Sequence, residues 1–256
     1  MCIIKKGIDV YTNRVIVELE DNSLNAQKRF KEYVIDSKVI TYKMGEKNSV
    51  TATYKAGEKT TYRYTEKNGD LTNEKYIHCS IGFRAKRNGK VGYVTAGHCA
   101  KPDGGSFTIG TVGKAIYTET MDAALVIANS GVSISNDLKY YGTGFGDPKT
   151  LKFSSTSTYV VGGLIAKVGQ TTQYRTGKIT AVSFTATTTD GQKHTNMMKS
   201  DAYNDQGDSG GPILSLDKLT SGTLIGITSI GKNGGGDLTG FYRVQDALNQ
   251  LGATAY

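Results

Sequence analysis

The residues Gly-Asp-Ser-Gly-Gly-Pro at 207–212 place a serine hydroxyl on a glycine-rich turn. Acyl transfer by a serine needs a neighbouring base, a carboxylate that orients the base, and backbone donors where the oxyanion forms. Glycines around Ser209 let the backbone curl, so that the amides of Gly207 and Ser209 can converge on one oxygen. An ordinary turn is the alternative interpretation, but this string seldom arises by chance. We predict a nucleophile at Ser209 and an oxyanion hole formed by Gly207 and Ser209.

The base must come from one of three histidines. His98 follows an apolar segment in the run Thr-Ala-Gly-His-Cys, whereas His78 and His194 lie in no motif and are expected at the surface. Asp122 begins an apolar run, where a partly buried carboxylate needs a partner such as His98. An Asp that only caps a strand is the alternative for Asp122. We predict that His98 is the base and that Asp122 orients it.

The net charge of +8 raises the possibility of a nucleic-acid or membrane partner. The 31 Lys and Arg residues are scattered, and the densest groups, at 84–90 and 28–31, are short. A polyanion site usually needs a longer run or a recognisable motif, so we expect a solvated basic surface. No stretch reaches the 18 or so consecutive apolar residues of a membrane-spanning helix. We expect neither a nucleic-acid partner nor a membrane partner.

The three cysteines are Cys2, Cys79 and Cys99, and their spacing does not suit a zinc site. One disulfide and one unpaired thiol form a simple alternative. The first six residues are too short for a signal peptide. Either the protein is cytosolic or an upstream part is missing, and composition leaves both open.

The elements that must position these residues fall into two regions. Residues 1–50 read as strand, strand, helix and strand, with the helix marked by an apolar stripe at Ala26, Phe30, Tyr33 and Val34. From residue 51 to 256, short β-like segments follow one another between turn signals, which is typical of a barrel or sandwich. The apolar spacing over 244–251 predicts one closing helix, with Gly252 as its stop. We expect an all-β domain at 51–256 behind a small α+β unit at 1–50.

The order His98, Asp122, Ser209, with TAGHC, DAAL and GDSGGP around them, resembles the trypsin/chymotrypsin superfamily over residues 76–251. Within it, the chain is similar to the bacterial branch of alpha-lytic protease and the streptogrisins. The resemblance implies two perpendicular six-stranded antiparallel β-barrels, with His98 and Asp122 on the first and Ser209 on the second. It also implies a serine endopeptidase that forms an acyl-enzyme and needs no metal or organic cofactor. A catalytically weak or inactive protease-fold binding module is the alternative.

Further residues are assigned by the same resemblance. Cys79 and Cys99 would form the disulfide beside the catalytic histidine. Lys167 stands where this branch has an arginine, and would pair with Asp208. The residues implied in substrate binding are Ser229, Ile230 and Gly231 on the strand that pairs with the substrate, Tyr203 and Asn204 at the pocket floor, and Gly240 in its wall.

The chain also departs from this branch. Two disulfides are missing: Ala166 and Thr176 replace one, and Tyr203 or Asp205 stands where a cysteine of the other is expected. We therefore expect a looser substrate pocket. Thr228, where a histidine would stand, argues against the glutamate-specific relatives.

Residues 7 to about 48 resemble the last portion of the pro-region of this branch. The resemblance implies a zymogen that is secreted, with its export signal upstream and self-cleavage between Lys47 and Lys59. The expected partners are peptide or protein substrates and the chain's own pro-segment, and we expect a monomer.

Overall fold

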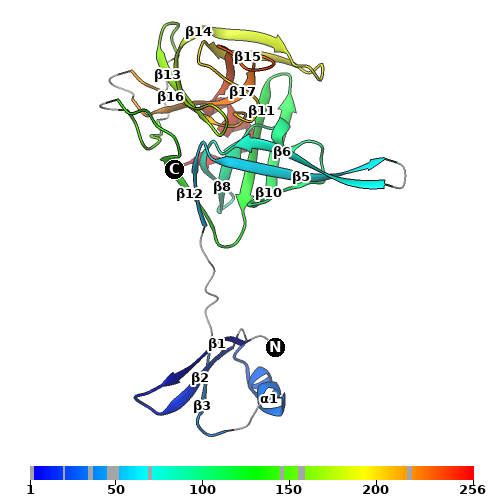
Figure 1. Ribbon diagram of the computed structural model, residues 1–256, viewed down its shortest axis with the longest axis vertical. Coiled ribbons are helices and arrows are strands. Elements are labelled where there is room, and N and C mark those ends of the chain that lie inside the picture. Colours follow the sequence, from blue (N-terminus) through cyan, green and yellow to red (C-terminus); the bar gives the residue numbers. More distant parts are fainter. Residues whose placement is uncertain are drawn as a thin grey trace. The chain divides into compact units, whose positions relative to one another are not determined.

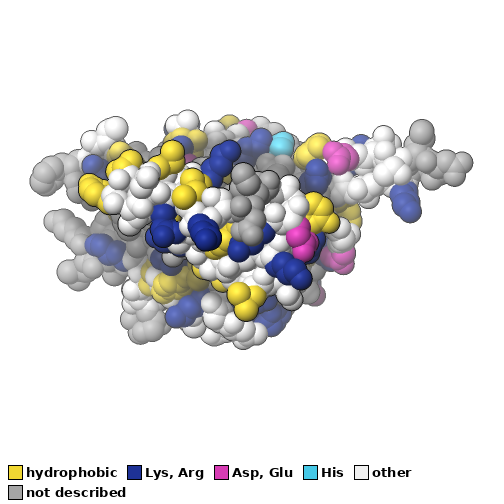
Figure 2. All heavy atoms as spheres, turned by 90° about the horizontal axis from the view of Figure 1, so that it is seen from below, with side chains coloured by type: hydrophobic (Ala, Val, Ile, Leu, Met, Phe, Trp, Pro, Cys, Tyr) yellow, Lys and Arg dark blue, Asp and Glu magenta, His cyan; other side chains and the backbone are white. Residues whose placement is uncertain are grey.

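The computed structural model describes residues 3–19, 21–33, 37–44, 52–68, 71–144, 147–154, 159–217 and 221–256. The chain divides into two compact units, 1–50 and 51–256 (Figure 1). Within the described residues, no helix is long and apolar enough to cross a membrane. Figure 2 shows Lys and Arg side chains spread over the face that it draws, interrupted by apolar and other side chains.

The first unit is a three-stranded sheet with one helix. Strand β1 (Ile3–Asp9) pairs antiparallel with β2 (Arg14–Leu19), which pairs in parallel with β3 (Ile40–Met44). Helix α1 (Leu24–Tyr33) begins after Ser23, whose hydroxyl accepts a hydrogen bond from the amide of Ala26. The core of the unit consists of Val17, Leu19 and Phe30, with Ala26 also buried.

The apolar stripe predicted for this helix is correct only in part. Ala26 and Phe30 are buried, but Tyr33 is 80% exposed. The reason is that the small core, built around Val17, Leu19 and Phe30, lies beneath the earlier turns and not beneath the last residue of α1. Val34 lies outside the described residues.

The first half of the second unit is an eight-stranded sheet, in the order β19-β7-β8-β11-β10-β9-β5-β6. It differs from the expected six-stranded barrel because β19 takes the free edge of β7, while β4 and β12 pair in parallel with each other. The strands are β4 (Ala52–Ala56), β5 (Lys59–Asn68), β6 (Leu71–Ser80), β7 (Phe83–Arg87), β8 (Lys90–Thr95), β9 (Ser106–Phe107), β10 (Gly110–Thr118), β11 (Met121–Ala128), β12 (Val132–Leu138) and β19 (Thr254–Ala255).

The second half is a closed barrel of six strands. Helix α2 (Val244–Leu251) follows it and ends at Gly252, which has the left-handed conformation of a helix stop. Going around the barrel, the strands are β13 (Leu164–Gly169), β14 (Gln173–Thr187), β15 (Lys193–Ser200), β18 (Thr239–Arg243), β17 (Leu224–Gly231) and β16 (Pro212–Ser215).

The two halves of the second unit share one hydrophobic core. Phe83 and Leu125 of the first half belong to the same buried cluster as Val168 and Ile227 of the barrel, and α2 adds Leu251. Because protein interiors are close-packed, a common core fixes the two halves against each other. Residues at their boundary are therefore held in a defined geometry.

Candidate active site

His98 and Asp122 are joined by two hydrogen bonds. His98 begins a short 3₁₀ turn after β8, and Asp122 is the second residue of β11 and is fully buried. One carboxylate oxygen of Asp122 accepts the backbone N–H of His98 at 2.8 Å, and the other lies 2.7 Å from Nδ1 of the imidazole. The bond to the backbone N–H fixes the position of the loop, and the bond to Nδ1 fixes the orientation of the imidazole.

A third group contacts the carboxylate from the barrel. The hydroxyl of Ser229, on β17, donates to Oδ2 of Asp122 at 2.6 Å. Burial by itself raises the pKa of Asp122, but His98 and the donated hydrogen bonds outweigh it and hold that pKa below its ordinary value. Burial lowers the pKa of His98, yet Asp122 and the more distant Asp190 raise it above its ordinary value. A charged carboxylate thus supports a basic imidazole.

Ser209 and His98 line the same cavity, whose volume is about 740 Å³. No hydrogen bond joins them among the contacts of the described residues. Catalytic hydrogen bonds are often long in an enzyme without substrate and tighten in the complex, so this geometry suits a base that engages Ser209 once a substrate is bound.

Ser80 ties the turn of Ser209 to the first half of the unit. Its backbone N–H donates to the carbonyl of Ser209 at 2.8 Å, and its hydroxyl donates to the carbonyl of Gly207 at 2.9 Å. The preceding residue, Cys79, forms a disulfide with Cys99, the neighbour of His98. One covalent link therefore joins the strand that holds the serine turn to the turn that carries the histidine.

The carbonyl groups around the serine turn fix the direction of two amides. Gly207 has φ of +98°, which glycine adopts without strain. The carbonyl of Gln206 accepts the hydroxyl of Thr171 at 2.7 Å, and that of Asp208 accepts the amide of Gly211 at 3.0 Å. In a trans peptide the N–H points opposite to the C=O, so the amides of Gly207 and Ser209 are turned away from these partners. Neither amide has a partner among the described groups.

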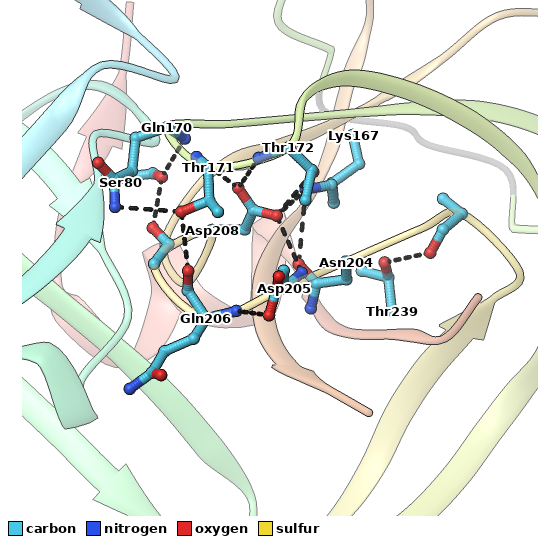
Figure 3. Close-up of polar contacts among 12 residues, drawn as sticks. Ser80, Lys167, Gln170, Thr171, Thr172, Asn204, Asp205, Gln206, Asp208 and Thr239 are labelled. Carbon is cyan, nitrogen blue, oxygen red and sulfur yellow. Dashed lines mark hydrogen bonds and ion pairs between the residues drawn. The ribbon is translucent and has the colours of Figure 1, made fainter. Parts of the chain in front are cut away.

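Lys167 and Asp208 form a fully buried ion pair, with 2.5 Å between Nζ and Oδ2. Thr172 accepts a hydrogen bond from Lys167 and donates one to Asp208, whose other oxygen accepts the amides of Thr171 and Thr172 (Figure 3). Burial raises the pKa of Asp208, but Lys167 and these donors bring it below its ordinary value. Burial lowers the pKa of Lys167 to about 8. The pair fixes the residue immediately before Ser209.

Four of the residues expected in substrate binding line the cavity: Asn204, Ser229, Ile230 and Gly231. Tyr203 and Gly240 are not among its lining residues. A Cβ on Gly240 would meet Ile230 and Met197, so this glycine faces the side chain of Ile230.

The cavity has other lining residues that the sequence did not suggest, among them Tyr117, Asp190, Lys232 and Leu238. Tyr117 lies between His98 and Asp122 in the sequence, and this position is the one signal that could have pointed to it. Nothing in the sequence around Asp190 indicates that its turn reaches the cavity.

His194 was expected at the surface, and this prediction is wrong. Its side chain is fully buried, with Nδ1 3.0 Å from the hydroxyl of Tyr242, and its ring lies 5.3 Å from that of Tyr117. The reason is the packing of β15 against the turn between β10 and β11, where the amide of Thr195 donates to the carbonyl of Glu119. His78, by contrast, is exposed and contacts Thr61.

At the two places where the bacterial relatives are expected to have disulfides, this chain has other contacts. Ala166 and Thr176, which replace one pair of cysteines, are direct partners across β13 and β14. The segment before Gly207, where a cysteine of the other disulfide was expected, is held by paired backbone bonds of 2.9 and 3.0 Å between Asn204 and Gly236. Hydrogen bonds therefore hold this segment without a covalent link.

Comparisons with known proteins show the family and the fold of the chain. Residues 71–250 match the family model described as Trypsin, and residues 3–45 match the one described as Pro-like C-terminal domain. Streptogrisin-D of Streptomyces griseus is 29% identical over 184 residues, which cover 68% of this chain and 44% of that protein. Glutamyl endopeptidase 2 of the same organism is 30% identical over 187 residues, covering 70% of this chain and 93% of that protein.

Solved structures give the same result. Thermobifida fusca Protease A superposes with a TM-score of 0.63 at 26% identity, covering 80% of this chain and 98% of that chain. Nocardiopsis protease gives a TM-score of 0.60 at 26% identity, covering 80% and 99%. The chain belongs to the trypsin family of serine proteases, and a Pro-like C-terminal domain precedes its protease domain.

Proposed function

We propose that this protein is a serine endopeptidase in which Ser209 is the nucleophile, His98 the general base and Asp122 the residue that orients the base. The observation that carries the proposal is the pair of hydrogen bonds from His98 to the buried Asp122, because it leaves Nε2 as the nitrogen that can take a proton.

The reaction begins when His98 removes the proton of the Ser209 hydroxyl as its oxygen attacks the carbonyl carbon of the substrate. The oxyanion that forms accepts hydrogen bonds from the amides of Gly207 and Ser209, whose directions are already set. His98 then gives its proton to the leaving amine as the C–N bond breaks, which leaves an acyl group on Ser209. Water, activated by the same imidazole, releases the acid and restores the hydroxyl.

Substrates are held by β17. Segment 229–231 lines the cavity, and a substrate in extended form would add to this segment by main-chain hydrogen bonds. Such bonds are independent of side chains, so the neighbouring residues of the cavity must supply the specificity.

The first unit acts as a pro-segment, and the protein is made as a zymogen. Support comes from the match of residues 3–45 to a Pro-like domain. Within the interval proposed for self-cleavage, residues 47–51 lie outside the described residues, while Ala52–Ala56 is paired with β12. Cleavage before Ala52 would leave that pairing intact, so we place it there. The mature protein is a secreted monomer, which suits its disulfide because such bonds persist in oxidising surroundings.

A fluorophosphonate probe tests the assignment of the nucleophile. The purified protein should be labelled and should hydrolyse casein, and Ser209→Ala should do neither. Labelling that survives in Ser209→Ala, or a processed protein without casein hydrolysis, would contradict the proposal. Amino-terminal sequencing of the active form tests the cleavage position.

A further inference from the structure

Two segments bound the cavity beside Ser209, residues 204–206 and residues 229–232, and we call the space between them the specificity slot. Asn204 is the first residue of the first segment. Asn204 lines the cavity although its exposed fraction is only 3%, because it is packed against the opposite segment.

The side chain of Asn204 crosses the specificity slot. Its Nδ2 donates to the carbonyl of Ile230 at 3.1 Å, so a side chain of one segment bonds directly to the backbone of the other. A Cβ on Gly231 would collide with the same nitrogen. The amide of Asn204 therefore occupies the space above Gly231, where a longer substrate side chain would have to enter.

Three further contacts hold Asn204 in place. Its Oδ1 lies 3.5 Å from Nζ of Lys167, so the buried ion pair also supports the amide (Figure 3). Its backbone N–H and C=O both bond to Gly236. Gly236 has φ of +153°, a conformation that other residues rarely adopt. Displacing Asn204 would break its bonds to Ile230, Lys167 and Gly236, and losing hydrogen bonds inside a protein is costly.

From this geometry we propose that Asn204 is a specificity-determining residue that restricts the specificity slot to small side chains, such as those of Ala and Ser, at the substrate residue whose carbonyl is cleaved. The inference rests on the proposed endopeptidase function. A large apolar side chain cannot pass the amide. An anionic side chain would lose water, while the buried cation next to Asn204, Lys167, is already paired with Asp208.

A series of peptide p-nitroanilides that differ only in the last residue, Ala, Phe, Lys or Glu, tests the proposal with the processed protein. We expect kcat/KM for Ala to exceed that for each of the others by at least roughly tenfold. Asn204→Gly should raise the ratio of kcat/KM for Phe to kcat/KM for Ala by at least roughly tenfold. Asn73→Ala is the matched control, because Asn73 is exposed on β6, and it should keep the preference unchanged.

The outcomes separate the inference from the proposed function. A protein that fluorophosphonate labels at Ser209 but that prefers Phe, Lys or Glu overturns the inference and leaves the endopeptidase. Absence of labelling and of hydrolysis overturns both. Should Asn204→Gly fail to fold, peptide boronates ending in Ala or Phe decide with the unsubstituted protein: tighter inhibition by Ala supports the proposal, and equal or tighter inhibition by Phe overturns it.

Discussion

The hydroxyl of Tyr117 donates to Oδ2 of Asp190 at 2.8 Å, and this bond joins the two halves of the protease domain beside His98. Tyr117 belongs to β10, whereas Asp190 lies in the turn between β14 and β15 of the barrel. The ring of Tyr117 also lies 5.9 Å from that of His98, in an edge-on arrangement. The charge of Asp190 therefore raises the pKa of the imidazole, and its bond to Tyr117 holds the ring that packs against His98.

Asp190→Asn should shift the acid limb of the pH profile. Asp190 is one of the groups that raise the pKa of His98, after Asp122. The imidazole is a base only when neutral, so activity appears as the pH rises through this pKa. Removing the charge of Asp190 lowers the pKa, and the acid limb of kcat/KM should move to lower pH. Asp246→Asn on α2 is a control with the same change of charge and should leave the limb in place.

Lys167→Arg should extend activity to higher pH. Burial lowers the pKa of Lys167 to about 8, and above this pH the ammonium that pairs with Asp208 loses its proton. We therefore expect kcat/KM to fall as the pH rises through about 8. Arginine stays charged throughout this range, so the alkaline limb should move upward. An unchanged limb would mean that the ion pair does not control it.

Removing the disulfide should reduce both stability and activity. Cys79 and Cys99 are 20 residues apart, and closing a loop of this size stabilises a protein by about 3 kcal/mol in the chain-entropy model. The double substitution to Ala should lower the free energy of unfolding in urea by about that amount. Because the bond holds the turn of His98, kcat should fall as well, even where the protein is fully folded.

Thr171→Val should lower kcat with little change in KM. The hydroxyl of Thr171 fixes the carbonyl of Gln206, and with it the direction of the Gly207 amide. Loss of an oxyanion donor costs roughly a hundredfold or more in kcat, and loss of its orienting bond should cost less, roughly tenfold. Thr111→Val, at an exposed position on β10, is the matched control. A change confined to KM would contradict this role.

Short motifs let the sequence alone indicate the family and the strand-rich fold, and the comparisons confirm both. Such motifs are informative because a nucleophile, its turn and its oxyanion donors lie within a few residues of one another. Helix α2 also follows from a local pattern of apolar residues, whereas the closed second barrel was implied by the family resemblance. For the first half of the domain these patterns could not show which strand edges meet, and the expected closed barrel differs from the sheet observed there.

Contacts between distant segments were decided only by the tertiary structure. His194 has no motif, yet packing of β15 against the turn at Glu119 buries it. Asn204 was recognisable as a residue near the pocket, but its bond to Ile230 depends on how β17 lies against the serine turn. The physical reason is that a pattern of apolar residues shows which face of a strand or helix is buried. Which distant segment packs against that face is decided by the close packing of the whole core.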